Sequence, residues 1–542
     1  MTEKRTATLQ AGGHNVTWFS SVSRHEAFYL LLIILAGAAF RIYHIGWLPL
    51  WLDEAASEWM SRQSVSYLLT VLPTYETNPP FYYLLLKGWR TLLGDGESAL
   101  RSLSALIGTA TIPVVFIMGR MLGGKLSGGT VGLLAAAMFA LSPLHVLYGQ
   151  EARAYTLLVF SVALSMLGMM WLIFHTPQIC ARSDQPEFEK GGKHFPWVLG
   201  LLALGMAMIM WSHDTGALAV LAIVLPGVYW WVTDAKCSLR ALIRLAIAGV
   251  FALALFLPYL GHLLSHMGMV KSFWIVAPTW SDITEVTTRI FGSATQGAFI
   301  FFIVFWSLGI FGINALWRRG LRSVVFLLLS VGLVPMGLEL LVSFFAMPIF
   351  LDRTLIYASI PLFIAAAYAI TQIPVRSGVA AVSLVGILMI DLGLYYKEAK
   401  KEPWNLIAAY LSDSLQPGEP VILLPNYLLL PLDYYASRQK RDALQRIGVP
   451  VDWQDPALRQ QSRIDQPAEK KTVGVDLDRI SRLIRGSKKL GMVMRRVDLV
   501  DPKLLVKQEV LKTHVITETK VFYTVTVLLF EARESHGDVS KP

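Results

Sequence analysis

Two adjacent carboxylates, Asp53 and Glu54, stand in the segment LPLWLDEAASEWM at residues 48–60, directly after an apolar run. Their neighbours are mostly apolar or aromatic, which is an unusual setting for paired acids. A carboxylate within hydrogen-bond reach of a reacting hydroxyl can take its proton as a general base. Asp at the start of an amphipathic run is also a common helix cap, so the sequence leaves both roles open for Asp53.

Two further charged segments, each beside an apolar run, contain arginine. They hold Glu151, Arg153 and Tyr155 in SPLHVLYGQEARAYTLL at 142–158, and Asp352 and Arg353 in FLDRTLIYASIPL at 350–362. A guanidinium binds phosphate oxygens through two parallel hydrogen bonds, whereas lysine acts as a point charge. Charged groups at the ends of segments that could span a membrane are functional candidates. The competing explanations are ion pairs at helix ends and anchoring of the side chains at the membrane interface.

A double proline lies in the same loop as Asp53, in YETNPPFYYLL at 75–85. Proline disrupts a helix interior but is favoured in a first turn, so the segment that begins at Asn78 should end one helix and start another. Taken alone, the segment is simply a turn. Its place in this loop adds three residues that could shape the site or bind an anion: Tyr82, Tyr83 and Lys87.

His262 and His266 are four residues apart in a predicted outer loop, a spacing that could bind a divalent metal ion. Such pairs are more often ordinary surface residues. They are weak metal candidates, and the sequence requires no cofactor.

The composition indicates that membrane helices hold these residues in place. Of 542 residues, 54% are hydrophobic and 16% charged, the mean hydropathy is +0.51, and a soluble chain would carry about 25% charge. The net charge of +10 is spread over short loops, which is typical of orientation in a membrane and argues against a nucleic-acid partner. With only two cysteines, no disulfide framework is indicated.

A segment of about 20 mostly apolar residues is needed to cross a bilayer. The sequence predicts eleven such segments, at roughly 27–46, 98–118, 127–147, 154–174, 196–212, 216–232, 241–258, 298–316, 323–343, 354–370 and 378–396. FYYLLLKGWRTLL at 81–93 is short and charged, which favours a juxtamembrane or partly inserted helix in the first outer loop. We therefore expect about 11 to 13 transmembrane helices.

The distribution of Lys and Arg predicts the orientation. With the N-terminus inside, the inner loops hold 14 of these residues and the short outer loops 7, in agreement with the positive-inside rule. All the charged candidates then lie on the outer face. We expect a cytoplasmic tail at 1–26, a transmembrane domain at 27–397 and an extracytoplasmic domain at 398–542.

The last region changes from long apolar runs to short alternating ones. PVILLP, LGMVMRRV and VFYTVTVLLFEA are typical of strands, and WNLIAAYLSDSL and DRISRLIRG of helices. About 145 residues suffice for one small α/β domain. The predicted fold class is therefore an all-α polytopic membrane domain followed by a small soluble α/β domain.

The order and spacing of several segments resemble the bacterial C-type-fold (GT-C) membrane glycosyltransferases. These segments are LDEAASEW, NPPFYYLLLKGW, ALRSLSALIGT, ALSPLHVLYGQEARAYTLL and RTLIYASIPLF. The resemblance is closest to glycosyltransferase family 39 and the related lipopolysaccharide-core transferases, and it extends to protein O-mannosyltransferases and the lipid A aminoarabinose transferase. It covers roughly residues 27–400 and is strongest over 47–160.

The resemblance implies an integral protein of the bacterial cytoplasmic membrane. Such a protein would transfer a hexosyl or pentosyl group from a polyprenyl-phosphate donor to a lipid, glycan or protein acceptor on the outer face. The resemblance implies that Asp53, with Glu54 beside it, corresponds to the acidic residue of the first outer loop that acts as the base. The acidic-x-arginine element corresponds to Glu151 and Arg153. The arginine that faces the lipid phosphate corresponds to Arg353.

The chemistry of these residues fits an inverting displacement, because there is one base and no covalent intermediate. Lys87 could add positive charge near the leaving phosphate. Many relatives carry His or Lys immediately before the double proline. This chain has Asn78 there, which departs from the family pattern at a position assigned to phosphate or metal contact.

Other classes of protein stay open. A transporter or flippase of lipid-linked glycans would also place polar groups in outer loops, but the sequence has no evident inverted repeat or matching broken helices. A non-catalytic membrane scaffold with a soluble binding domain would not need an acid and two arginines on one face. An O-antigen-ligase-like enzyme would take a diphosphate-linked donor and rely on a histidine/arginine pattern. This chain instead has the acidic LDE segment at residues 52–54.

Overall fold

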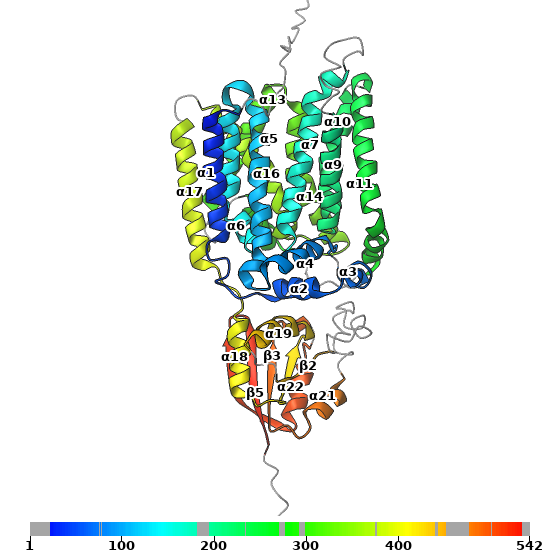
Figure 1. Ribbon diagram of the computed structural model, residues 1–542, viewed down its shortest axis with the longest axis vertical. Helices are drawn as coiled ribbons and strands as arrows, with labels where there is room; N and C mark the ends of the chain where they lie inside the picture. Colours follow the sequence, from blue (N-terminus) through cyan, green and yellow to red (C-terminus); the bar gives the residue numbers. More distant parts are fainter. Residues whose placement is uncertain are drawn as a thin grey trace, which may run out of the picture.

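The computed structural model of the protein is a bundle of long helices with a smaller domain of helices and strands at one end (Figure 1). The structure describes residues 22–74, 76, 78–180, 195–233, 235–269, 277–291, 299–373, 377–439, 443–450, 476–499 and 501–533.

The long helices follow the apolar segments of the sequence. They are α1 (Arg24–Ile42), α5 (Glu97–Leu141), α6 (Pro143–Gly149), α7 (Tyr155–Cys180), α9 (Phe195–Ser212), α10 (Gly216–Thr233), α11 (Ala235–Met269), α13 (Phe299–Arg318), α14 (Arg322–Phe345), α16 (Ser359–Thr371) and α17 (Ser377–Glu398). Within the described residues, seven helices are long and apolar enough to cross a membrane, or eight if one bent pair counts as a single span. Helices occupy all eleven predicted segments, and the prediction of a polytopic helical protein is confirmed.

The helix α5 contains the predicted span 98–118 and most of the predicted span 127–147, and it turns back on itself between them. The second span ends in α6, at an angle of 57° to the end of α5. Gly124 has φ +66° and ψ −152°, a conformation that glycine adopts readily and other residues rarely do. At Gly123, an added Cβ would lie 2.5 Å from the backbone of Gly128. Glycine is therefore required where the two halves of α5 approach each other.

Short helices lie across one end of the bundle (Figure 1). The loop between α1 and α5, which the sequence predicts to be the first outer loop, forms α2 (Leu52–Arg62), α3 (Val65–Thr70), η2 (Leu72–Thr74) and α4 (Phe81–Leu93). Later loops form α12 (Trp280–Phe291), α15 (Asp352–Leu355) and η3 (Ile356–Ala358). The segment 81–93 is a helix of 13 residues that begins after Pro80. The prediction of a short helix at this position is confirmed, and its juxtamembrane or partly inserted placement stays a prediction.

The smaller domain is a five-stranded sheet with helices packed on it. Its elements are α18 (Trp404–Ser414), β1 (Pro420–Leu424), η4 (Asn426–Leu428), α19 (Leu429–Arg438), β2 (Gln445–Gly448), α21 (Leu477–Ile484), β3 (Lys489–Met494), η6 (Val497–Leu499), α22 (Leu505–Leu511), β4 (His514–Phe522) and β5 (Val525–Ala532). The strand order is β2-β1-β3-β5-β4. β1 is parallel to β2 and β3, whereas β5 is antiparallel to β3 and β4. The predicted α/β character is confirmed.

One predicted strand is wrong in its extent. The sequence VFYTVTVLLFEA is not a single strand, because β4 ends at Phe522 and β5 begins at Val525. Tyr523, between them, has φ +57°, which is the backbone conformation of a tight hairpin turn. The apolar and β-branched residues on both sides hide this turn in the sequence.

The smaller domain packs against the first outer loop through α19, which contacts α2. Leu50 N donates a hydrogen bond to Tyr435 Oη at 2.7 Å, and Tyr434 Oη donates to Asp95 O at 2.9 Å. One hydrophobic cluster includes Leu50 from the loop and Tyr435 from the smaller domain. The membrane bundle, the outer loop and the smaller domain therefore form a continuous packed structure.

Candidate functional site

Asp53 meets two arginines from distant parts of the chain. Its Oδ2 atom lies 3.8 Å from Arg153 Nη2 and 3.6 Å from Arg353 Nη1. The three side chains are 25%, 12% and 18% exposed, in that order. The structure thus brings together the acid and both arginines that the sequence singled out, at the outer-loop end of the bundle.

Asp53 does not cap the helix that follows it. The helix α2 begins at Leu52, so Asp53 lies within its first turn. Glu54 reaches back to the start of the helix instead, where its Oε2 atom accepts a hydrogen bond from Trp51 N at 3.4 Å. The cap interpretation of Asp53 is wrong, and its carboxylate is directed toward the two arginines.

Tyr155 lies beside both guanidinium groups. Arg153 Nη2 donates to Tyr155 Oη at 3.4 Å. The guanidinium carbons of Arg153 and Arg353 lie 5.5 Å and 6.0 Å from the centre of the Tyr155 ring. Two positive charges therefore share one carboxylate and one aromatic face, and the group retains a net positive charge that suits an anionic ligand.

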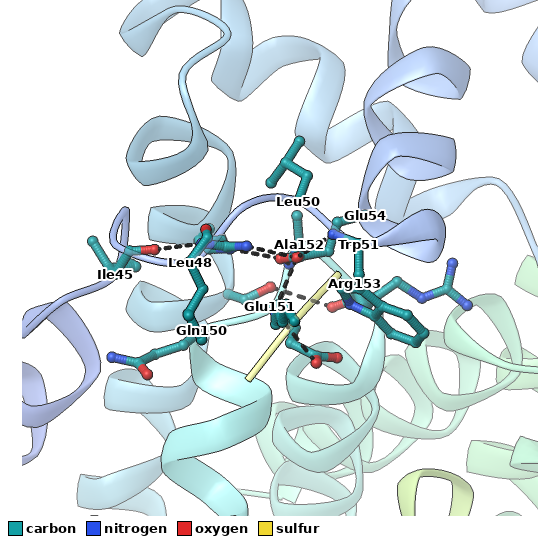
Figure 2. A network of polar contacts seen from close by, with 12 residues as sticks. Ile45, Leu48, Leu50, Trp51, Glu54, Gln150, Glu151, Ala152 and Arg153 are labelled. Atoms are coloured by element: carbon teal, nitrogen blue, oxygen red, sulfur yellow. Dashed lines mark hydrogen bonds and ion pairs between the residues drawn. The ribbon is translucent and has the colours of Figure 1, made fainter. Parts of the chain in front are cut away.

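Glu54 is fully buried and is held by a network of charged and polar contacts (Figure 2). Arg101 Nε donates to Glu54 Oε1 and Arg101 Nη2 donates to Oε2, both at 2.7 Å. Lys401 Nζ lies 2.9 Å from Oε2. Burial alone would raise the pKa of Glu54, but Arg101 and Lys401 outweigh it and lower the pKa to about 2.

The same arginine fixes the chain just before α2. Arg101 donates from Nη1 to the carbonyl oxygens of Ile45 at 2.8 Å and Leu48 at 2.7 Å, and from Nη2 to that of Pro49 at 2.9 Å. Ile45 and Leu48 lie on one side of the network in Figure 2, with Glu54 on the other. Arg101 therefore sets both the path of the loop and the position of the first turn of α2.

Glu54 also connects α2 to the loop that carries Arg153. Its Oε1 atom accepts a hydrogen bond from Ala152 N at 3.0 Å. Glu151, the preceding residue, lies with Oε1 3.6 Å from Lys401 Nζ, and burial raises its pKa despite this cation. Figure 2 shows Glu151, Ala152 and Arg153 following one another through the network.

The double-proline segment lies near Asp53 and Arg153. Asn78 donates to Glu76 Oε1 from N at 2.9 Å and from Nδ2 at 2.6 Å. Burial raises the pKa of Glu76, which lies within the electrostatic range of Arg153 and Asp53. Asn78 therefore orients a second carboxylate near the centre.

The two tyrosines of α4, Tyr82 and Tyr83, are buried near the loop that carries Arg153. Tyr82 Oη shares a hydrogen bond with Ser104 Oγ at 2.8 Å, and Ser104 Oγ donates to Arg153 O at 3.2 Å. Tyr83 is 2% exposed. Tyr82 thus supports the backbone of Arg153 through Ser104.

Other predicted residues are not brought to this centre. Lys87 Nζ donates to Gln63 O at 2.8 Å, and so it joins α4 to the end of α2. His262 packs beside Tyr259, with ring centres 5.5 Å apart, while the side chain of His266 lies outside the described residues. No group of three or more His, Cys, Asp or Glu that could hold a metal ion occurs in the part of the chain that the structure describes. Metal binding by the histidine pair stays a prediction.

Four residues in or near the site were not singled out in the sequence as site residues. They are Arg101, Lys401, Glu76 and Arg289, the last of which pairs with Asp352 at 2.9 Å. Arg101 had a signal, because a charged residue in a predicted span usually contacts a partner. Lys401 had none, since it follows other lysines in what reads as a linker.

Comparison with solved structures identifies the fold. ArnT from Cupriavidus metallidurans in the apo state matches with TM-score 0.59 and 15% identity over 93% of this chain and 98% of that one. The same protein bound to undecaprenyl phosphate matches with TM-score 0.54, 14% identity and the same coverage. The archaeal oligosaccharyltransferase AglB from Archaeoglobus fulgidus, in complex with an inhibitory peptide and a dolichol-phosphate, matches with TM-score 0.55 and 11% identity over 88% of this chain and 70% of that one.

A scan against models of protein families finds no match, and a search of curated proteins finds none. The structural matches are to GT-C glycosyltransferases. They confirm that the chain has the GT-C fold, as the resemblance in sequence implied.

Proposed function

We propose that this protein, which has the GT-C fold, is an inverting glycosyltransferase that transfers a sugar from a polyprenyl-phosphate donor to an acceptor hydroxyl. The observation that carries the proposal is the meeting of Asp53 with Arg153 and Arg353 on one carboxylate oxygen. The fold adds support, because ArnT and AglB have been seen with undecaprenyl phosphate and dolichol-phosphate bound.

In the proposed reaction, Asp53 accepts the proton of the acceptor hydroxyl as the acceptor oxygen bonds to the anomeric carbon of the sugar. The bond between that carbon and the phosphate oxygen breaks, and the polyprenyl phosphate leaves with the electron pair. Arg153 and Arg353 stabilise the charge that develops on the phosphate. Attack from the side opposite the leaving group inverts the anomeric centre.

The remaining residues have supporting roles in this proposal. Glu54 is not a second base, because it is fully buried and its oxygens already accept hydrogen bonds from Arg101, Lys401 and the Ala152 amide. It positions Asp53 instead. Tyr155 orients the two guanidinium groups, and Glu76 with Asn78 borders the acceptor side.

The proposed location of the reaction is the outer face of the bacterial cytoplasmic membrane. The short helices α2, α3 and α4 and the smaller domain lie at the same end of the bundle (Figure 1), and the charge asymmetry of the loops supports placing this end outside. The acceptor is then an envelope lipid, glycan or protein. The proposed donor is embedded in the surrounding membrane lipid.

The decisive test is sugar transfer by the purified full chain in detergent. Mass spectrometry of envelope lipids and glycans, with and without the protein, first identifies the sugar and the acceptor. The Asp53→Asn variant keeps the size of the side chain but cannot take the proton, so we expect transfer to fall by about 10²–10⁴-fold. Its melting temperature should stay close to that of the wild type.

Asp478→Asn is the matched control, because Asp478 is an exposed acid on α21 in the smaller domain. Full transfer by Asp53→Asn would refute the catalytic assignment. A protein that moves lipid-linked glycans across the membrane without forming a new glycosidic bond would instead favour the transporter alternative.

A further inference from the structure

Lys401 lies in the segment between the last membrane helix and the smaller domain, yet its ammonium group is part of the network around Glu54. Lys401 Nζ is 2.9 Å from Glu54 Oε2 and 3.6 Å from Glu151 Oε1. The side chain of Lys401 is 11% exposed, against 0% for Glu54 and 8% for Glu151. A lysine so placed differs from the exposed lysines of an ordinary linker.

The segment is fixed on both sides of Lys401. Before it, Tyr395 Oη donates to Gln150 Oε1 at 2.9 Å. After it, Trp404 Nε1 donates to Glu402 Oε2 at 2.9 Å, and the Trp404 side chain is fully buried. Glu402 also pairs with Arg495, from the end of β3. The ammonium group is therefore held in place by contacts to the bundle and to the smaller domain.

The charge of Lys401 matters most for Glu151. Among the described residues, Lys401 is the one cation in an ion pair with Glu151, and Glu151 Oε2 is buried without a hydrogen-bond partner there. A buried carboxylate that loses its cation carries a large desolvation cost. Without Lys401, Glu54 would keep its ion pair with Arg101, whereas Glu151 would lose its ion-pair partner and keep only the electrostatic influence of Arg353.

The two carboxylates are joined to the centre through the backbone. Glu54 is adjacent to Asp53, and its Oε1 atom accepts from Ala152 N. Ala152 lies between Glu151 and Arg153 in sequence. A shift of Glu54 or Glu151 would therefore change the position of Asp53 relative to Arg153.

We propose that Lys401 is a positioning residue for sugar transfer. It holds Glu54 and Glu151 together and so fixes Asp53 against Arg153. The inference rests on the proposed function. It makes the docked smaller domain a working part of the site, because the chain that enters this domain supplies the cation.

The test compares Lys401→Met with the wild type, using full-length protein and the donor that supports wild-type transfer. Methionine keeps the length and apolar stem of lysine but removes the charge. Because misplacement by about 1 Å can cost about 10²-fold in rate, we expect kcat to fall by about 10–100-fold. The KM for the donor should change far less, since the relation of Asp53 to Arg153 matters most in the transition state.

Two further variants separate positioning from simple stabilisation. Lys401→Arg keeps a cation that can contact both carboxylates, and it should restore kcat to within a few-fold of the wild type. Lys400→Met removes the neighbouring exposed lysine and should leave kcat unchanged. A purely structural role for Lys401 predicts a lower melting temperature in Lys401→Met but an unchanged kcat per folded molecule.

A wild-type kcat in Lys401→Met would overturn the positioning role of Lys401 but not the proposed function. Equal losses of kcat in Lys401→Met and Lys401→Arg would do the same. Absence of transfer by the wild type would overturn the proposed function and this inference with it. If Lys401→Met does not fold, Lys401→Gln takes its place, because glutamine keeps a neutral donor toward Glu54. The same fall in kcat is then expected.

Discussion

Replacing Glu54 with glutamine should destabilise the protein more than it changes the chemistry. The carboxylate is fully buried, and its negative charge is balanced by Arg101 at 2.7 Å and Lys401 at 2.9 Å. Glutamine has a similar size and can keep some hydrogen bonds, but it leaves the buried Arg101 without its anion and Lys401 with only Glu151, at 3.6 Å. Breaking a buried ion pair from one side typically costs about 3–5 kcal/mol.

The pKa of Glu54 gives a second measure of the same interaction. The value falls from 4.5 to about 2 on folding, and each unit of difference corresponds to about 1.4 kcal/mol. The ionised form of Glu54 therefore contributes on the order of a few kcal/mol to folding. Solvent does not screen this interaction, because the Glu54 side chain is 0% exposed.

The sign of the pH dependence follows from the direction of this shift. A carboxyl group with a lower pKa in the folded state contributes its stability above the pKa of the unfolded state, and the contribution is lost as the pH falls through the folded value. Wild-type stability should thus decrease between about pH 4.5 and pH 2. Glu54→Gln should lack this part of the decrease, because it has no group to titrate.

The assay is thermal unfolding of the purified protein in detergent, with Asp53→Asn as the paired variant. We expect Glu54→Gln to unfold at a temperature several degrees below the wild type, and Asp53→Asn to unfold near the wild type. The two neighbouring positions should therefore separate stability from catalysis. An unchanged melting temperature in Glu54→Gln would refute the conclusion that its charge holds the network together.

Two other predictions concern the arginines and the orientation. Arg153→Lys and Arg353→Lys should each lose much of the transfer activity while the protein stays folded in the membrane, because a point charge does not reproduce bidentate binding of phosphate; wild-type rates in both variants would make these residues interfacial anchors. A reporter that is active only outside the cytoplasm should give signal when fused after Pro542, and a signal from a cytoplasm-only reporter at that point would reverse the proposed orientation.

The helical membrane domain and the charged residues at one end of it could be predicted because the signals are local. Long apolar segments show where helices cross the membrane, and Asp53, Arg153 and Arg353 stand out as charges at their ends. The alternating segments of the last region likewise indicated strands. The short elements β2, α19 and α22 were not predicted. The turn at Tyr523 was also missed, because its positive φ is not encoded by glycine or asparagine.

The network beneath the centre could not be predicted, because it depends on contacts between distant segments. Glu54 resembled a second catalytic acid until its partners were known, and its role depends on Arg101 and Lys401, at separations of 47 and 347 residues. Glu76 was also hidden, since its nearness to Arg153 and Asp53 depends on how distant segments fold together. A pattern in one segment does not reveal which ion pairs folding will bury.

The place of Lys401 in the chain has a consequence for the order of synthesis. Ribosomes make the first outer loop early, with Asp53 and Glu54, and Lys401 only after the last membrane helix. A growing chain that ends before residue 401 holds Glu54 through Arg101 but has no ammonium group between Glu54 and Glu151. The network is thus completed only once the segment beyond α17 has been made and has reached the face of the membrane on which the loop lies.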